Sequence, residues 1–190
     1  MSIREFSLKY GIDERLVKAV ASVESSGNGF NEDGSLKIRI EAHLILNKYP
    51  HLSKWFKVGT PSFLEHYYKF PSYSSRWRSI HTGNYFDEYQ ALLTASFQIG
   101  NLSFDSVSMG SFQIMGFHFA NLGFKNSLEM FTFASQSKEN DLTIGLRFLE
   151  SNRNIIQALQ QKDVISFASL YNGNNADVYS ERIEREYNKL

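Results

Sequence analysis

Two helical patterns open the chain. The run from Ser2 to Glu5 has the form of a capping box, and it predicts a short helix that ends at Gly11. A second helix begins at Asp13 and ends in residues 25–29, whose Ser, Gly and Asn content favours a turn. The apolar residues of this second helix recur at helical spacing and form one stripe: Leu16, Val17, Val20, Ala21 and Val23.

A strand pattern follows the second helix. Residues 37–43 alternate between polar and apolar side chains, which predicts a strand, and residues 44–49 lose this alternation and favour a helix. From residue 87 onward helical patterns dominate, over residues 87–100, 104–108, 110–121, 127–133, 138–150, 153–162, 163–171 and 176–188. The chain is therefore expected to be α+β and predominantly α-helical, with one small β-sheet or hairpin after the second helix.

The length and composition are those of one folded domain. The chain has 190 residues, 42% hydrophobic and 21% charged, and we expect a single domain over residues 1–190 because no repeat or linker divides it. Lys+Arg and Asp+Glu both number 20, so the formal net charge is zero. A neutral chain lacks the basic surplus that nucleic-acid binding requires, and it has no long-range attraction to an anionic membrane or cell wall.

The residue inventory disfavours several kinds of chemistry. Cysteine is absent, which excludes disulfides and a thiol nucleophile. The histidines have no spacing typical of metal ligands, so we expect neither a metal site nor an organic cofactor: His43, His51, His66, His81 and His118. The N-terminal residues hold no apolar core long enough for a signal peptide, and no run approaches a membrane span. We expect synthesis in the cytoplasm, with delivery to any external target by some other means.

Glu24 is the first candidate for catalysis. It follows Val17 and Val20 by seven and four residues, so it projects from the apolar stripe, and it lies in the last turn of the predicted helix. Burial and the negative end of the helix dipole both disfavour a carboxylate, which raises the expected pKa. A carboxylic acid that stays protonated near neutral pH is what a glycosidase uses to protonate a leaving oxygen. By position alone, a carboxylate at a helix end that reaches solvent is the simpler interpretation.

Glu41 is the second candidate carboxylate. On the alternating segment it shares a face with Lys37, Arg39 and His43, and alone this face is most simply a solvated, mixed-charge strand surface. However, the chain leaves the Glu24 helix by a short Gly-rich turn and returns as this strand. Glycoside hydrolysis needs two carboxylates that face each other across a cleft.

A glycine-led segment and an aromatic turn complete the candidate site. Gly110 precedes a predicted helix and would let the backbone approach a ligand closely, while Gln113 offers both a donor and an acceptor to a sugar. Tyr171, Asn172 and Gly173 form an aromatic–amide–glycine turn where a ring could stack on a sugar face. Each feature alone is more typical of a helix start or a turn than of a binding site.

Four segments in this order resemble the N-acetylmuramidase domain of phage endolysins. They are VESSGNGF (23–30), IEAH (40–43), SMGSFQIMG (108–116) and YNG (171–173), and the resemblance extends over about residues 10–190. That family is part of the lysozyme-like superfamily, with goose-type lysozymes and lytic transglycosylases. The resemblance implies a lysozyme-like fold and an enzyme that cleaves peptidoglycan.

The resemblance also implies roles for individual residues. It implies that Glu24 is the general acid and Glu41 the second carboxylate. It implies that the saccharide cleft is lined by Gly110, Ser111, Gln113, Tyr171, Asn172 and His43. Ile40 stands where the family usually has Phe, and Met109 where it usually has Trp, which removes one aromatic ring from the expected cleft. The separate cell-wall-binding domain of many such endolysins is not expected here.

The sequence therefore predicts a monomeric muramidase acting on peptidoglycan glycan strands in the periplasm or cell wall. It would cleave the β-1,4 bond between N-acetylmuramic acid and N-acetylglucosamine, with Glu32 or Asp33 as alternative bases if Glu41 pairs instead with Arg39 or His43. A strand that faces a helix terminus leaves room for water between two acids, so we expect an inverting mechanism. The alternatives are a lytic transglycosylase, which needs only one Glu, and a catalytically silent glycan-binding or structural module.

Overall fold

The computed structural model describes residues 1–59, 65–70, 76–173 and 175–190. The chain folds into two compact units. Unit 1 contains Met1–Leu36, Gly110–Ile114 and Phe133–Leu190, and unit 2 contains Lys37–Met109 and Met115–Thr132. Within the described residues, no helix combines the length and the apolar character that a membrane crossing requires.

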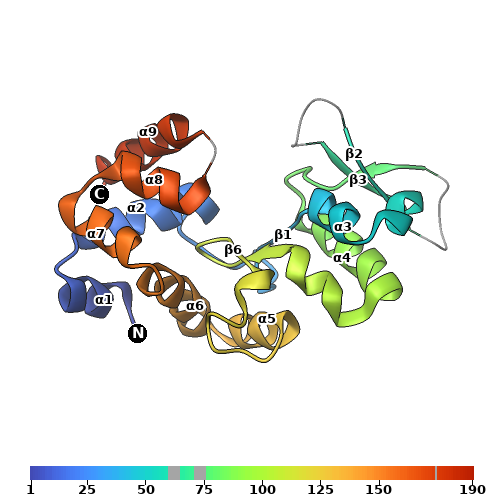
Figure 1. Cartoon of the computed structure of the whole chain (residues 1–190), viewed down its shortest axis with the longest axis horizontal. Helices are drawn as coiled ribbons and strands as arrows, with labels where there is room; N and C mark the ends of the chain where they lie inside the picture. The colour runs from blue at the N-terminus through green and yellow to red at the C-terminus, as the bar shows by residue number, and fades with distance from the viewer. Residues whose placement is uncertain (60–64, 71–75, 174) are drawn as a thin grey trace. The chain divides into compact units, whose positions relative to one another are not determined.

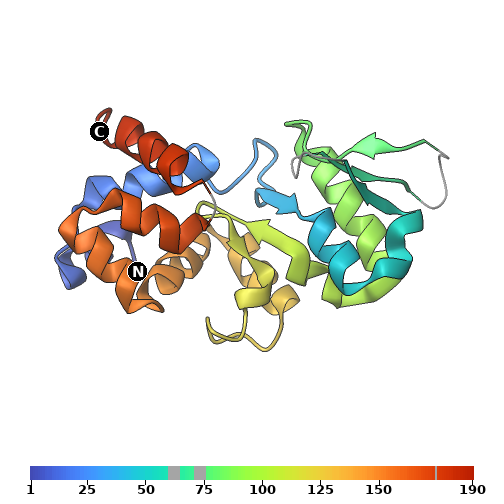
Figure 2. The same cartoon turned by 45° about the horizontal axis from the view of Figure 1, so that its top comes forward.

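Unit 1 is helical. Its helices are α1 (Ile3–Tyr10), α2 (Glu14–Ser25), α6 (Lys138–Glu150), α7 (Arg153–Gln161), α8 (Val164–Asn172) and α9 (Ala176–Tyr187). Helix α9 lies against both α2 and α8, so the first and last parts of the chain are neighbours in this unit (Figures 1 and 2). The predicted helices over residues 138–150, 153–162, 163–171 and 176–188 are therefore confirmed.

Capping explains why α1 and α2 begin and end where the sequence predicts. Ser2 and Glu5 form the expected capping box, and Gly11 ends α1 in the left-handed conformation. The Asp13 side chain accepts a hydrogen bond from the backbone N–H of Arg15 at the start of α2. Four of the five residues of the predicted apolar stripe are buried, with Leu16, Val17, Val20 and Ala21 at most 4% exposed, whereas Val23 is half-buried.

Unit 2 contains two small antiparallel sheets. Strand β1 (Ile38–Ile40) pairs with β5 (Val107–Met109) so that Ile38 faces Met109, and β6 (Ile114–Met115), where the chain changes unit, is the third strand of this sheet. Strands β2 (Phe56–Val58), β3 (His66–Tyr68) and β4 (Arg78–Ser79) form the second sheet, which the sequence did not predict. The other elements of unit 2 are α3 (Ala42–Lys48), η1 (Pro50–Lys54), α4 (Tyr85–Ile99), η2 (Gly100–Ser106) and η3 (Gly116–His118). Helix α5 (Ser127–Gln136) begins in unit 2 and ends in unit 1.

The predicted strand over residues 37–43 is shorter than expected. It ends at Ile40, and Glu41 is the N-cap of α3, so Glu41 and His43 do not share a strand face with Arg39. The backbone N–H groups of Leu44 and Ile45 donate to the carbonyl of Glu41. Ala42 and Ile45 are three residues apart and fully buried, a spacing that a helix satisfies, and this burial outweighs the alternation in the sequence.

The predicted helices over residues 104–108 and 110–121 are wrong. The chain there forms the end of η2, then β5, a turn, β6 and η3. Gly110 and Gln113 adopt positive φ angles of 74° and 47°, which an α-helix does not contain. Pairing of buried Val107 and Met109 with β1 overrides the local helical pattern.

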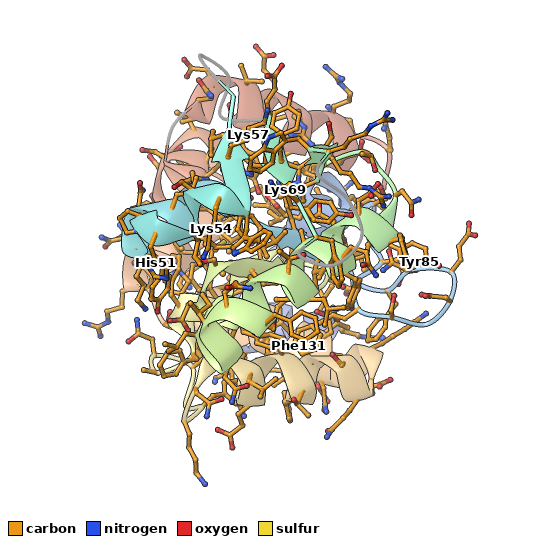
Figure 3. All side chains as sticks on the ribbon, turned by 90° about the vertical axis from the view of Figure 1, so that its right-hand side faces the viewer. His51, Lys54, Lys57, Lys69, Tyr85 and Phe131 are labelled. Atoms are coloured by element: carbon orange, nitrogen blue, oxygen red, sulfur yellow. The ribbon has the colours of Figure 1, made fainter. Side chains whose placement is uncertain are left out.

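The segment that contains β2, β3 and β4 has a concentration of positive charge. Residues 48–81 contain six Lys or Arg and one acidic residue, Glu65. Figure 3 shows Lys54, Lys57 and Lys69 on one side of the molecule. The Lys57 ammonium lies 4.7 Å from the ring centroid of Tyr67 and 4.9 Å from that of Trp77. This face of unit 2 is therefore both cationic and aromatic.

Candidate active site

Glu24 lies in the last turn of α2, as the sequence predicts. Its Oε1 accepts a short hydrogen bond from the hydroxyl of Tyr179 on α9. The Arg182 guanidinium, also on α9, donates to the carbonyl of Val23 over 3.0 Å, so a cation stands at the negative end of α2. Helix α9 therefore fixes both the carboxyl group of Glu24 and the helix end that carries it.

Tyr179 is part of a column of aromatic rings. Its ring is stacked on Tyr171 of α8 with 10° between the planes and 6.1 Å between centroids, and Tyr171 is stacked in turn on Phe167. The Tyr171 hydroxyl donates to the carbonyl of Phe112 over 2.5 Å. Burial, with the nearby charge of Glu24 as a second cause, raises the pKa of both tyrosines above the ordinary value. Tyr179 thus remains a neutral donor to Glu24 at neutral pH.

The turn between β5 and β6, which is part of unit 1, is held to α6 by Asp141. The Asp141 carboxylate accepts from the backbone N–H of Ser111 at 3.0 Å and from its hydroxyl at 2.6 Å. A Cβ on Gly110 would lie 1.7 Å from Asp141 Oδ1, and one on Gly29 would lie 2.1 Å from Oδ2. Both glycines are required for this close approach, and burial raises the pKa of Asp141.

The same turn is joined to the end of α2. The hydroxyl of Ser25, directly after Glu24, donates to the carbonyl of Ser111 over 3.0 Å. The Gln113 side chain donates to the carbonyl of Gly110 over 2.9 Å within the turn. Asn172 is the last residue of α8, one position after Tyr171. Unit 1 thus brings the turn that contains Gly110, Ser111 and Gln113, and also Tyr171, close to the end of α2 that carries Glu24, while Asn172 lies at the end of α8.

Glu41 and His43 lie in unit 2, in a different polar cluster. Arg39 Nε is 3.1 Å from Glu41 Oε1, and His43 Nδ1 is 3.4 Å from Glu41 Oε2. The fold adds His66 from β3, whose Nδ1 is 3.5 Å from the same oxygen. His81 Nε2 is 2.8 Å from the same nitrogen of His66, so His81 also belongs to this cluster.

The sequence analysis missed the residues that support these two carboxylates. Tyr179 contacts Glu24 across 155 positions of sequence, and His66 lies 23 positions from His43, so spacing along the chain carries no signal for either. Asp141 did carry a signal. Asp141, which holds the turn between β5 and β6, lies four residues before Gly145 on the buried face of the predicted helix over residues 138–150, where an acidic residue is unusual.

Comparison with known proteins supports the resemblance stated from the sequence. The family model for N-acetylmuramidase matches residues 13–190. Among solved structures, the crystal structure of the Burkholderia AP3 phage endolysin is similar, with a TM-score of 0.72 and 26% sequence identity, over 98% of this chain and 68% of that chain. No curated protein sequence matches this chain.

These similarities confirm the predicted fold class, which is α+β, predominantly helical and lysozyme-like. The family match extends over nearly the whole chain and includes all four motifs on which the prediction rested. This protein therefore belongs to the N-acetylmuramidase family of peptidoglycan-degrading enzymes.

Proposed function

We propose that this protein hydrolyses the β-1,4 bond between N-acetylmuramic acid and N-acetylglucosamine and thereby lyses bacterial cell walls. The observation that carries the proposal is the oriented carboxyl group of Glu24, which sits at the end of α2 with Tyr179 as its hydrogen-bond donor. Protonation of a glycosidic oxygen requires an acid held in a fixed direction, because geometry and proton transfer both contribute to the rate.

Each carboxylate has a distinct role in this proposal. Glu24 donates its proton to the glycosidic oxygen as the bond breaks. Glu41 activates a water molecule or stabilises the oxocarbenium-like transition state. Gly110, Ser111, Gln113, Tyr171, Asn172 and His43 contact the sugars. The lytic reaction itself uses no metal or organic cofactor.

The protein would act as a monomer in which residues 1–190 form one catalytic domain. Its substrate is the glycan strand of peptidoglycan, in the periplasm or cell wall, after synthesis in the cytoplasm. This substrate needs no nucleic-acid contact and no membrane insertion.

Mass spectrometry of digested peptidoglycan tests the activity and the bond together. We expect fragments with a reducing N-acetylmuramic acid end from the wild type. Fragments that end in a 1,6-anhydro sugar would identify a lytic transglycosylase instead. Binding without any released fragment would identify a silent glycan-binding module.

The Glu24→Gln variant tests the acid. Glutamine keeps the size and can still accept the Tyr179 hydrogen bond, but it has no proton to transfer, so lytic activity should fall at least about a hundredfold. Circular dichroism should show an unchanged fold. A variant with near-normal lysis would contradict the assignment of Glu24.

The Glu41→Gln variant and the product anomer test the second carboxylate. We expect this variant to lose most of its activity and the wild type to release the inverted α-anomer, which proton NMR of the first-formed reducing end detects. A β product would contradict inversion, and full activity in Glu41→Gln would remove Glu41 from the mechanism while leaving Glu24 in place.

A further inference from the structure

Three side chains of unit 2 bring together the donor atoms of a metal site. Glu41, His43 and His66 each offer one ligand atom, and these atoms all lie within 4.8 Å of one another. His43 Nδ1 is 3.4 Å from His66 Nε2 and 3.4 Å from Glu41 Oε2. In a tetrahedral site with metal–ligand bonds of about 2.0–2.1 Å, neighbouring ligand atoms are separated by roughly 3.3–3.4 Å. The two measured edges therefore match the spacing that such an ion requires.

A second set of residues orients the His66 ring. Glu88 Oε1 is 2.7 Å from His81 Nδ1, and His81 Nε2 is 2.8 Å from His66 Nδ1. Glu88 is itself held, because its Oε2 accepts from the backbone N–H of Ile40 over 2.8 Å. A carboxylate oxygen accepts, so His81 donates from Nδ1 to Glu88, and in this tautomer its Nε2 accepts. His66 then donates from Nδ1, which leaves the lone pair of Nε2 directed towards His43.

The surroundings of His66 also suit a ligand. Its side chain has no exposed surface. Neutral imidazole, with one nitrogen bonded to a neighbouring group, is the form in which histidine ligates metals, and partners that fix the ring raise metal affinity. The chain of Glu88 and His81 is such a partner.

The two oxygens of the Glu41 carboxylate have different neighbours. Arg39 pairs with Oε1 at 3.1 Å, whereas Oε2 faces the two histidines. The His43 side chain is 34% exposed and that of Glu41 is 16% exposed, so an ion has a route from solvent to a site whose far wall is buried. One carboxylate and two imidazoles form a ligand set that favours zinc-like ions over Mg²⁺ or Ca²⁺, which prefer oxygen ligands.

We propose that Glu41, His43 and His66 bind one divalent transition-metal ion of the Zn²⁺ type, with His81 and Glu88 positioning His66. Three protein ligands leave a fourth position for water. The sequence predicted no metal site because His43 and His66 have no ligand spacing along the chain; the contact between α3 and β3 creates it. If Glu41 also serves as the second carboxylate, which rests on the proposed function, the bound ion occupies its Oε2 and inhibits lysis.

Calorimetric titration of Zn²⁺ into the EDTA-treated, dialysed chain of 190 residues tests the site directly. We expect one equivalent of Zn²⁺ to bind, and Co²⁺ to give the visible absorption bands of a four-coordinate ion. His43→Gln should weaken binding at least tenfold and remove those bands. This variant changes a half-exposed side chain, so the fold, checked by circular dichroism, should persist. His51→Gln, which removes an imidazole from η1 outside the site, should bind like the wild type.

Further outcomes separate this proposal from the lytic function. His81→Gln should weaken Zn²⁺ binding about tenfold, because it removes the partner that orients His66. Absence of saturable Zn²⁺ binding, or equal affinity in wild type and His43→Gln, would overturn the site whatever the lytic activity. Stoichiometric binding with undiminished lysis would support the metal site and contradict the catalytic role of Glu41.

Discussion

At the scale of single residues, the support of Glu24 comes from a tyrosine that the sequence did not indicate. Tyr179 donates to the carboxyl group and is itself stacked on Tyr171, so its ring cannot turn without disturbing α8. Its raised pKa keeps the hydroxyl protonated across the range in which lysis would be measured. Tyr179 is therefore a positioning residue that acts through Glu24.

Tyr179→Phe should lower kcat about tenfold and leave KM nearly unchanged, because it removes the hydroxyl that directs the acid and no proposed sugar contact. The measurement is the initial rate of turbidity loss over a range of substrate concentrations. Tyr187→Phe is the matched control on the same helix, since its hydroxyl donates to Asp13 and not to Glu24. Equal activity of the two variants would contradict the positioning role.

Gln113→Ala and Tyr171→Ala test the proposed sugar contacts. Both variants should weaken glycan binding, with only a modest loss of thermal stability for Gln113→Ala. Tyr171 also bonds Phe112 and stacks on two rings, so its variant should lose more stability. Unchanged glycan affinity in the folded fraction would assign either residue a purely structural role.

At the scale of elements, one capping residue connects the start of α2 with two other helices. Asp13 caps α2 and also accepts hydrogen bonds from Lys162, after α7, and from Tyr187 on α9. The hydrogen bond from Lys162, followed by that from Tyr187, lowers the pKa of Asp13 well below its ordinary value. Asp13 thus favours folding through its charge as well as through its cap.

Asp13→Asn and Asp13→Ala separate these two contributions. A depressed folded-state pKa stabilises the protein above the unfolded-state pKa of about 3.9, and this stabilisation is lost as pH falls below that value. Asp13→Asn keeps the cap and should cost less than about 1 kcal/mol at pH 7, with the deficit shrinking below pH 4. Asp13→Ala should lose about 1 kcal/mol more at every pH. Urea unfolding at several pH values measures the loss of stability in both variants. A loss in Asp13→Asn that grows towards low pH would contradict the expected pH dependence.

The turn between β5 and β6 depends on the absence of a side chain at Gly110. Gly110→Ala combines a positive φ angle of 74° with a clash against Asp141, whereas Gly11→Ala has a similar φ of 63° and no neighbour within 4 Å. We expect Gly11→Ala to cost about 1 kcal/mol and Gly110→Ala roughly 1–3 kcal/mol more in denaturant unfolding. Equal losses would show that strain in the backbone alone, and not the contact with Asp141, requires glycine here.

At the scale of the whole molecule, the zero net charge is the sum of a negative unit 1 and a positive unit 2. Unit 1 contains eleven Lys+Arg and fourteen Asp+Glu, while unit 2 contains nine and six. The positive surplus of unit 2 lies in the segment that forms β2, β3 and β4 (Figure 3). The sequence analysis used the net charge to exclude attraction to an anionic cell wall, but a local cationic face can supply that attraction without a net charge.

The double variant Lys57→Gln/Lys69→Gln tests this face in the Glu24→Gln background, where binding is separated from cleavage. We expect severalfold weaker pelleting with peptidoglycan sacculi at low ionic strength and a smaller difference at high salt, because salt screens exposed charges. Lys9→Gln/Lys18→Gln removes the same charge from unit 1 and should bind normally. Equal loss in both double variants would indicate a nonspecific effect of charge.

The sequence by itself determined the helices whose signals are local. Ser2 and Asp13 cap α1 and α2 through bonds to residues two or three positions away, so the first two helices and the place of Glu24 follow from the chain alone. The order of the four motifs also determined the family, because it depends on residue identity and not on the packing of distant elements.

Only the tertiary structure decided what surrounds the two carboxylates. Residues 104–108 and 110–121 have helical patterns, yet residues 107–115 form β5, a turn and β6. Pairing of β5 with β1 satisfies buried backbone groups, and a local pattern contains no information about such a distant partner. Tyr179 reaches Glu24, and His66 reaches His43, through packing between elements distant in sequence. Capping and periodicity act within a few residues, whereas the support of an active carboxylate depends on which distant elements pack together.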